Sequence, residues 1–253
     1  MKVTVVGTGT ASPSRRRRQS CVAVETGGQV LVFDAGPGAA RGMRRSGLDP
    51  SAVDSIFFTH FHPDHTFGVV PLLSAIKYRA KTPRVLPLVL AGPEPFRGFW
   101  RSFTRVWGGW LMGGYPTEVR ELPRDCRAPL DLPGCRLAWA PARHRPESIA
   151  YRLEKGDGAF VVTGDTEYAG SVVELARGAH TVLIECSFPN ERPVPGHLTP
   201  SGVARIASEA GVERVVLTHI GPQAGRLDLA EEVARGGYPG EVIVAEDGYE
   251  FDV

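Results

Sequence analysis

Residues 59–65 read THFHPDH, so three histidines and one aspartate fall within the short span His60–His65. Imidazole nitrogens and carboxylates are ligands for zinc and similar divalent ions. Core packing does not require such a cluster, because each buried histidine would need a hydrogen-bond partner of its own. The stretch therefore predicts a metal site.

The residues just before this cluster, SIFFT (55–59), favour a β-strand, which places the cluster in the loop at the strand's C-terminal end. In an extended stretch the side chains of His60 and His62 point the same way, while Asp64 and His65 open the following helix. Four candidate ligands exceed the three that a catalytic zinc ion usually takes from its protein. We therefore expect two ions close together, each completed by ligands from elsewhere.

Three further predicted strands are each followed by a loop with one ligand-type residue, namely His144, Asp165 and His219. A rigid sheet can hold side chains at its strand ends in fixed positions, which metal binding requires. A single histidine after a strand is most often incidental. Beside the first cluster, however, all three residues are expected to complete the metal site.

Short runs of β-branched residues predict strands along the whole chain. They cover residues 2–6, 21–25, 30–33, 55–59, 87–91, 136–140, 149–154, 159–163, 181–185, 214–218 and 241–245. Helices are expected over 38–46, 65–79, 168–177, 200–210 and 226–235. Strands come in runs and then alternate with helices, which indicates an α/β (α+β) protein with helices packed outside its sheets in four layers. No linker-like stretch divides the chain, so residues 1–253 are expected to form a single domain.

The composition excludes several classes of protein. With 42% hydrophobic and 23% charged residues and a net charge of +1, the chain lacks the basic excess expected for binding a long nucleic acid, although a local basic patch is compatible with that total. Its four cysteines are scattered without a Cys-x-x-Cys pair, which favours reduced thiols in the cytoplasm. No run of about 18 apolar residues exists, and the glycine-broken N-terminus does not resemble a signal peptide, so no membrane association is expected.

The order of the motifs carries a resemblance to a known family. The motifs are VFDAG (32–36), HFHPDH (60–65), RHRPES (143–148), TGDT (163–166) and LTHIGP (217–222). In this order they resemble the metallo-β-lactamase superfamily, and are most similar to its ribonuclease Z-like branch and that branch's phosphodiesterase relatives. The resemblance implies an αββα sandwich with a two-metal site at one edge.

The resemblance also implies two sets of ligands joined by a bridging residue. They are His60, His62 and His144 for the first ion, Asp64, His65 and His219 for the second, and Asp165 between the two. Asp34 would orient a ligand loop rather than bind metal. The alternative is that this aspartate only forms the turn before Gly36. Zinc is the expected ion, and manganese and iron accept the same nitrogen and oxygen ligands.

Two such ions can share a hydroxide, lower its pKa toward ~7 and polarise the electrophile's oxygen, which predicts a hydrolase. The same chemistry serves phosphodiesters, lactones, thioesters and β-lactams. An alkoxide leaving from phosphorus gains from a general acid. His197, in PVPGHLTPSGVARIA (193–207), resembles the histidine that serves this purpose in ribonuclease Z-like proteins, although a surface-loop histidine is the alternative. Asp64 would also orient the attacking hydroxide, whereas His180 is interpreted as structural.

The substrate is the least determined feature. Residues 183–206 and 214–223 resemble phosphodiesterases that open small cyclic phosphates, but the cysteine cluster near the N-terminus of that group is missing. True ribonuclease Z carries a long glycine-rich and basic arm, and no such insertion separates Trp139 from Asp165. We therefore expect a phosphodiesterase of small or nucleotide-like substrates. The alternatives are a hydrolase of lactones, thioesters or β-lactams, a tRNA 3′-processing endonuclease, and a non-catalytic metal-binding sensor.

Two segments have open interpretations. RRRR (15–18) is either a solvated loop or a contact for substrate phosphate, since guanidinium groups match phosphate oxygens well. Residues 96–110 are rich in aromatics at helical spacing, with arginines on another face. That pattern fits a helix packed on the core, a subunit interface in a homodimer, or a wall of the substrate cleft.

Overall fold

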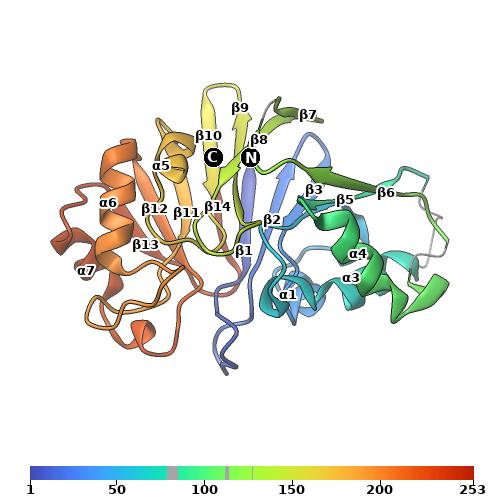
Figure 1. The fold of residues 1–253 in the computed structure, drawn as a ribbon, viewed down its shortest axis with the longest axis horizontal. Coiled ribbons are helices and arrows are strands. Elements are labelled where there is room, and N and C mark those ends of the chain that lie inside the picture. The colour runs from blue at the N-terminus through green and yellow to red at the C-terminus, as the bar shows by residue number, and fades with distance from the viewer. Residues whose placement is uncertain (79–84, 112–113, 127) are drawn as a thin grey trace.

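The computed structural model describes residues 1–78, 85–111, 114–126 and 128–253. Two seven-stranded sheets face each other (Figure 1). The first sheet runs, in spatial order, β14 (Tyr249–Asp252), β1 (Lys2–Gly7), β2 (Cys21–Thr26), β3 (Gln29–Phe33), β4 (Val53–Phe57), β5 (Leu88–Pro93) and β6 (Thr117–Leu122). The second runs β13 (Glu241–Val244), β12 (Arg214–Thr218), β11 (Thr181–Glu185), β10 (Gly158–Val162), β9 (Ile149–Lys155), β8 (Cys135–Pro141) and β7 (Leu130–Leu132).

Each sheet is mixed, with an antiparallel part and a parallel part. In the first sheet β3, β4, β5 and β6 are parallel, with Ser55 opposite Val89, for example. In the second sheet β10, β11, β12 and β13 are parallel, with Leu183 opposite Val216. Parallel strands present their carboxyl ends at one edge, so the loops that leave β4, β10 and β12 can carry a common site.

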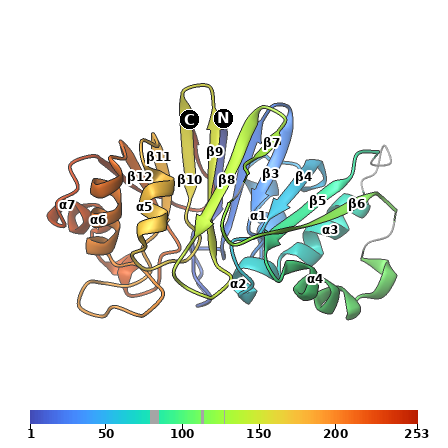
Figure 2. The ribbon, with the colours of Figure 1, turned by 45° about the horizontal axis from the view of Figure 1, so that its top comes forward.

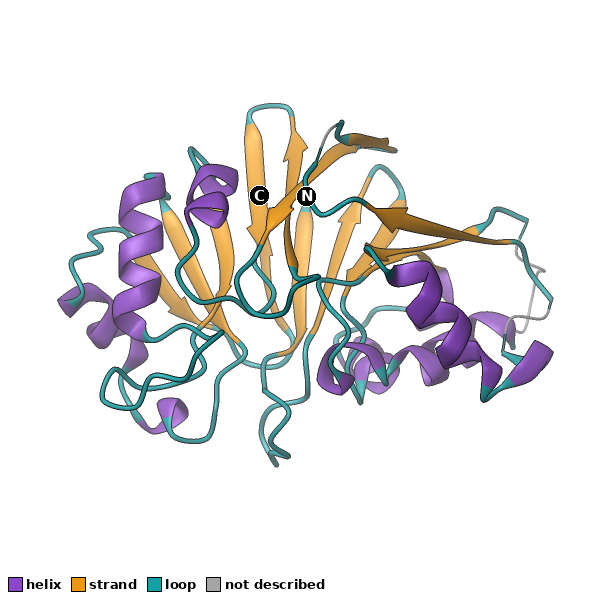
Figure 3. Ribbon diagram, in the orientation of Figure 1, coloured by secondary structure: helices purple, strands orange, loops and turns teal. Residues whose placement is uncertain are grey.

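Helices cover the outer faces of both sheets (Figures 2 and 3). They are α1 (Ala39–Arg45), α2 (Pro63–Thr66), α3 (Val69–Lys77), α4 (Phe96–Arg105), α5 (Gly170–Ala176), α6 (Pro200–Ala210) and α7 (Leu229–Arg235), with short 3₁₀ turns at Pro50–Ala52, Gly108–Trp110 and Ala224–Arg226. Buried side chains of α1, α3 and α4 pack on the first sheet, and those of α5, α6 and α7 on the second.

A third buried cluster joins the two sheets, with Phe33 and Phe57 from one and Tyr151 from the other. The four-layer prediction is confirmed, whereas the single-domain assignment stays a prediction.

Every predicted strand is present with bounds shifted by a few residues, but three strands are missing from the prediction. These are β6, β7 and β14. The run TEVREL of β6 is largely charged, β7 has three residues, and β14 alternates apolar with acidic residues. None of them has the β-branched apolar run on which the prediction relied.

The helix predicted over 65–79 is interrupted, and residue 79 lies outside the described residues. The chain forms α2 and α3, separated at Phe67 and Gly68. The backbone N–H of Gly68 donates to the carbonyl of Ala35 at 2.7 Å, and a Cβ at this position would lie 1.8 Å from the carbonyl oxygen of Gly36. This close approach docks the segment that follows the predicted ligands His60–His65 onto the loop that begins at Asp34.

Among the described residues, no helix combines the length and the apolar character needed to cross a membrane. The four cysteines are free thiols.

Candidate metal centre

The predicted ligands lie in the loops that follow strands of both sheets. The loop after β4 supplies residues 60–65, and the loops after β8, β10 and β12 supply His144, Asp165 and His219. Packing of the two sheets brings these loops together, and their ligand-type atoms fall into sets. Within a set, the atoms lie no more than 4.8 Å apart. The structure thus assembles all seven residues at one place, and their binding of metal is a prediction that this geometry motivates.

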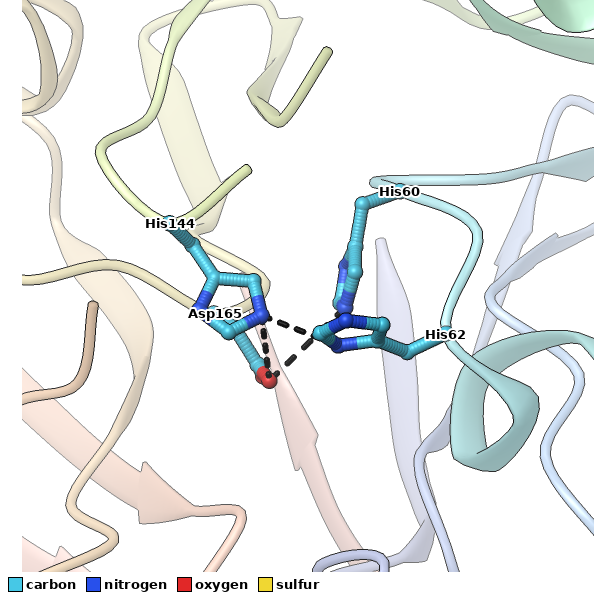
Figure 4. Close-up of side chains that lie close together, drawn as sticks. All are labelled: His60, His62, His144 and Asp165. Atoms are coloured by element: carbon cyan, nitrogen blue, oxygen red, sulfur yellow. Dashed lines mark hydrogen bonds and ion pairs between the residues drawn. The ribbon is translucent and has the colours of Figure 1, made fainter. Parts of the chain in front are cut away.

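His60, His62, His144 and Asp165 form the first set (Figure 4). His144 Nε2 lies 3.0 Å from His62 Nδ1 and 3.8 Å from Asp165 Oδ2. His60 Nε2 lies 3.8 Å from the same oxygen. Two imidazole nitrogens 3.0 Å apart need either a proton between them or a cation that both of them bind. His62 and His144 are partly exposed, so this set meets the solvent on one side.

Asp64, His65 and His219 form the second set, which is wholly buried. Asp64 Oδ2 lies 3.3 Å from His219 Nε2 and 3.7 Å from His65 Nε2. Asp165 Oδ1 lies 3.3 Å from His65 Nε2 and 3.5 Å from His219 Nε2. Asp165 thus turns Oδ2 to the first set and Oδ1 to the second, which is the arrangement that the predicted bridge requires.

The other ring nitrogen of most of these histidines is held by a neighbouring group. The contacts from Nδ1 are His60 to Thr59 Oγ1 at 3.0 Å, His65 to Asp34 Oδ2 at 2.7 Å, His144 to the Gly196 carbonyl at 2.9 Å, and His219 to Ser187 Oγ at 2.8 Å. Metal-binding histidines are commonly oriented in this way, with the second nitrogen fixing the tautomer and the ring plane. The arrangement leaves each Nε2 facing the centre of the cluster.

Several buried polar atoms at the centre lack a hydrogen-bond partner among the described residues. They include His60 Nε2, His65 Nε2 and Asp165 Oδ1. An unsatisfied buried polar group costs ~1–3 kcal/mol, so three of them at one point are unfavourable unless something binds there. The donor set of imidazole nitrogens and carboxylate oxygens suits divalent ions such as zinc.

The local electrostatics also suit cation binding. Burial lowers the pKa of His60 well below its ordinary value and that of His144 to about 4, so both rings stay neutral with a lone pair available. Burial opposes the ionised form of Asp165, but the neighbouring histidines, led by His219, outweigh it and hold the pKa of Asp165 well below its usual range. The first set therefore combines neutral imidazoles with a negative carboxylate.

Asp34 adopts the supporting position expected for it. Its carboxylate accepts hydrogen bonds from the backbone N–H and Oγ1 of Thr59, both at 2.8 Å, and contacts His65 Nδ1. Asp34 and His219 have positive φ angles of 58° and 50°, a conformation that few non-glycine residues adopt. An unusual backbone geometry therefore occurs at His219 within the second set and at Asp34 beside it.

His197 lies next to both sets, at the edge of the centre. Its ring centroid is 4.6 Å from that of His144, and its Nδ1 is 3.9 Å from Asp165 Oδ2. Nδ1 also lies 3.0 Å from Glu185 Oε1 and donates to it, which leaves Nε2 available for other contacts. Asp165, His197 and His219 also form a potential ligand set, so grouping alone does not separate His197 from the metal ligands.

Glu185 is a site residue that the sequence analysis missed. It is fully buried at the end of β11 and accepts hydrogen bonds from His197, from the Thr166 backbone N–H and from Ser187 Oγ, which also contacts His219. The available signal was an acidic residue that closes the largely apolar strand TVLIE (181–185). A buried carboxylate needs partners, and such a position points to a polar site nearby.

The structure places part of both segments whose interpretation was open. Arg17 and Arg18 turn inward, whereas Arg15 and Arg16 are exposed. Phe96 and Trp100 of α4 are buried, and Phe99 stacks at 4.5 Å on Phe61, the residue between His60 and His62. The packed-helix interpretation is confirmed for this part of the segment, while a role in a dimer or in a cleft wall stays a prediction.

Known proteins resemble the chain over almost its full length. Ribonuclease Z of Methanothermobacter thermautotrophicus is 26% identical over 291 aligned residues, which cover 94% of this chain and 92% of the relative. The alignment is longer than this chain of 253 residues, so the relative carries residues that this chain lacks.

Two solved structures show the same fold. The metallo-beta-lactamase fold protein YhfI from Bacillus subtilis has a TM-score of 0.84 at 23% identity, covering 99% of this chain and 98% of its own. A diphosphatase from the PhnP family has a TM-score of 0.73 at 22% identity, covering 100% of this chain and 97% of its own. At these identities the similarity concerns the fold.

The match to a family model is more decisive, because all seven predicted ligands lie within it. The last of them, His219, is the final matched residue. It spans residues 14–219, most of the chain, and its description is the Metallo-beta-lactamase superfamily. The predictions of fold and of a metal-dependent hydrolase are thereby confirmed at the level of the family. The chain belongs to the metallo-beta-lactamase superfamily.

Proposed function

We propose that this hydrolase is a phosphodiesterase that acts on small or nucleotide-like phosphodiesters with two divalent ions, zinc being the expected metal. The two residue sets joined by Asp165 would hold the ions. When bound, the ions would lower the pKa of water toward ~7 and polarise a phosphoryl oxygen. Their chemistry alone does not distinguish phosphorus from carbon as the electrophile.

The observation that carries the proposal is His197 with Glu185 behind it. Burial opposes the charged form of His197, but its hydrogen bond to Glu185, aided by Asp165, outweighs burial and raises the pKa above its ordinary value. A protonated imidazole beside the centre can deliver a proton from Nε2 to a leaving oxygen. An alkoxide that leaves phosphorus needs this help, worth ~10²–10⁴ in rate.

Asp64 is assigned a second role beside metal binding. Its carboxylate contacts His219 and lies beside both His65 and Asp165, and its pKa is lowered because these histidines outweigh the effect of burial. An ionised carboxylate there can accept a proton from the attacking water and orient it. Asp64 would thus act on the nucleophile while His197 acts on the leaving group.

A substrate panel tests the proposed class. It comprises bis(p-nitrophenyl) phosphate, a cyclic nucleotide, a lactone, a cephalosporin and a precursor tRNA, each assayed with the zinc-loaded protein. We expect phosphorus substrates to react with the higher kcat/KM. A clear preference for the lactone or the cephalosporin would replace the proposal with a carbonyl-ester hydrolase.

The His197→Ala variant tests the proton donor. We expect it to lose ~10²–10⁴ in kcat on a diester with an alkyl leaving group, and far less on bis(p-nitrophenyl) phosphate, whose nitrophenolate leaves without a proton. His180→Ala, which removes an exposed histidine outside the centre, is the matched control. An equal loss on both substrates would remove the acid role from His197.

A second candidate function is tRNA 3′ processing, which the similarity to Ribonuclease Z favours. Against it, the relative carries residues that this chain lacks, and the stretch from Trp139 to Asp165 is taken up by β8, β9, β10 and short loops. The precursor tRNA in the panel decides between the two. Cleavage at the 3′ end with the highest kcat/KM would favour the processing enzyme.

A further inference from the structure

The four arginines of residues 15–18 divide into an anchoring pair and an outward pair. Arg17 donates from one guanidinium nitrogen to Thr8 Oγ1 at 2.8 Å and to the carbonyl of Ala245 at 2.6 Å. Arg18 donates from Nε to the carbonyl of Val6 and lies 3.6 Å from Asp247. These contacts fix the loop to the body of the protein, so the run is not simply a solvated tail.

Asp247 is occupied by the same loop. Its carboxylate accepts hydrogen bonds from the Thr8 backbone N–H and hydroxyl and from the Arg18 backbone N–H. Its negative charge is therefore directed at the anchoring pair. Arg15 and Arg16 are exposed, and no acidic side chain among the described residues pairs with either of them.

The outward pair shares a hollow with two arginines of helix α1. Arg41 and Arg45 lie one helical turn apart on α1, both exposed, and both line a hollow of about 410 Å³ together with residues 14–18. Among the residues that line this hollow, one is acidic, namely Asp247. Within the described part of the chain no ion pair involves Arg41 or Arg45. Figure 1 shows the N-terminal loop and α1 at the same edge of the sandwich.

A second hollow lies between the arginine loop and the segment that follows His219. It measures about 350 Å³, shares residues 14–17 with the first, and is lined on its other side by Ile220, Gly221 and Pro222. Those residues directly follow the predicted ligand His219, and Ile220 pairs with Gly9 at the base of the arginine loop. The two hollows therefore adjoin at the arginine loop, with α1 on one side and the segment that follows His219 on the other.

We infer that Arg15, Arg16, Arg41 and Arg45 form a second phosphate-binding groove, which holds a phosphate of the substrate other than the one that is cleaved. The inference rests on the proposed phosphodiesterase function and extends it to the rest of the substrate. Guanidinium groups pair with phosphate oxygens through two parallel hydrogen bonds, and clustered like charges repel one another until an anion neutralises them. The phosphate would come either from an oligonucleotide backbone or from the terminal phosphate of a short nucleotide.

Charge-reversal variants on α1 test the groove. The probe is a short fluorescent RNA with phosphorothioate linkages, which resist cleavage, and its affinity is measured by fluorescence anisotropy at several salt concentrations. We expect Arg41→Glu and Arg45→Glu each to weaken binding about tenfold or more and to reduce the slope of log affinity against log salt by about 1. Arg44→Glu makes the same change of charge on the same helix outside the groove, and should have a clearly smaller effect.

Two kinetic arms identify the source of the phosphate. A dinucleotide is compared with and without a 5′-phosphate, and KM is measured for wild type and Arg41→Glu. If Arg41→Glu raises KM only for the phosphorylated dinucleotide, the groove binds a terminal phosphate. If it leaves KM unchanged for both dinucleotides and weakens only the binding of the longer RNA probe, the groove binds the backbone. Hydrolysis of bis(p-nitrophenyl) phosphate, which carries no second phosphate, should be unchanged.

The inference is wrong if Arg41→Glu and Arg45→Glu weaken RNA binding no more than Arg44→Glu does. It is also wrong if their slopes against salt equal that of the wild-type protein. Failure of the proposed function would look different. In that case bis(p-nitrophenyl) phosphate would resist hydrolysis by the wild-type protein, while the anisotropy comparison would still decide whether the groove binds phosphate.

Discussion

The two residue sets of the centre have similar ligands but different surroundings. In the first set His62 and His144 are partly exposed, and the groups in direct contact with its histidines are neutral. They are the Thr59 hydroxyl, which in turn donates to Asp34, and the Gly196 carbonyl. The second set is wholly buried, and carboxylates stand behind it. Asp34 contacts His65 directly, and Glu185 reaches His219 through Ser187.

This difference has an electrostatic consequence. Burial alone would lower the pKa of His65, but Asp165 and Asp34 outweigh burial and raise this pKa well above its ordinary value. At His144, by contrast, burial dominates and lowers the pKa to about 4. A carboxylate behind an imidazole makes it a more basic ligand, and a cation displaces the proton when it binds. We therefore expect the second set to hold its ion more tightly and the first to exchange its ion more readily and face the substrate.

The largest expected effect comes from removing the residue that both sets share. Asp165→Ala should reduce bound metal from two ions per chain to one or fewer, because each set loses an oxygen ligand. Activity should fall by more than ~100-fold, beyond the usual cost of losing a supporting residue. Elemental analysis of the purified protein gives the metal content, with Asp157→Ala at the exposed β9–β10 turn as the control. Retention of two ions by Asp165→Ala would refute the bridge.

A smaller and selective effect is expected at the second set. Asp34→Asn removes the charge behind His65 but keeps the side-chain shape, and asparagine tolerates the positive φ at this position. The tighter step of a calorimetric Zn²⁺ titration should weaken by ~10–100-fold. The weaker step should lose less, because Asp34 reaches His60 only through Thr59. Equal weakening of both steps would mean that the two sets do not differ in the way proposed.

The smallest effect is expected at the first set. Gly196 has a φ of 85°, and a Cβ there would lie 2.8 Å from His144 Nδ1, so Gly196→Ala should displace that ring. We expect the weaker titration step to lose about tenfold, within the range for a supporting contact. Gly178→Ala is the matched control, since Gly178 also has a positive φ, of 64°, but faces open space. If both variants behave alike, backbone strain rather than the His144 contact is responsible.

The sequence was most informative where chemistry is concentrated in short motifs. The run from His60 to His65 indicated a site for two ions, and the histidines and aspartate at three other strand ends are brought together with it in the structure. The buried strands were also predicted, because their β-branched runs differ sharply from the segments around them. Both signals are local, which is why a single sequence can reveal them.

Features that depend on contacts between distant segments were missed. Glu185 was not recognised, because its partners His197 and Thr166 reach it only in the folded chain. The break between α2 and α3 depends on the approach of Gly68 to the Asp34 loop. The division of RRRR into inward and outward pairs depends on Asp247, which lies more than two hundred residues away in the sequence.

The origin of the ligands in two different sheets also affects how the protein unfolds. Residues 60–65 follow β4 of the first sheet, while His144, Asp165 and His219 follow strands of the second. Bound ions would therefore tie the sheets together at one edge, and part of their binding free energy would stabilise the packing of one sheet on the other. The melting temperature of this protein should accordingly rise with the concentration of free metal, and a weakened core between the sheets could be compensated by metal alone.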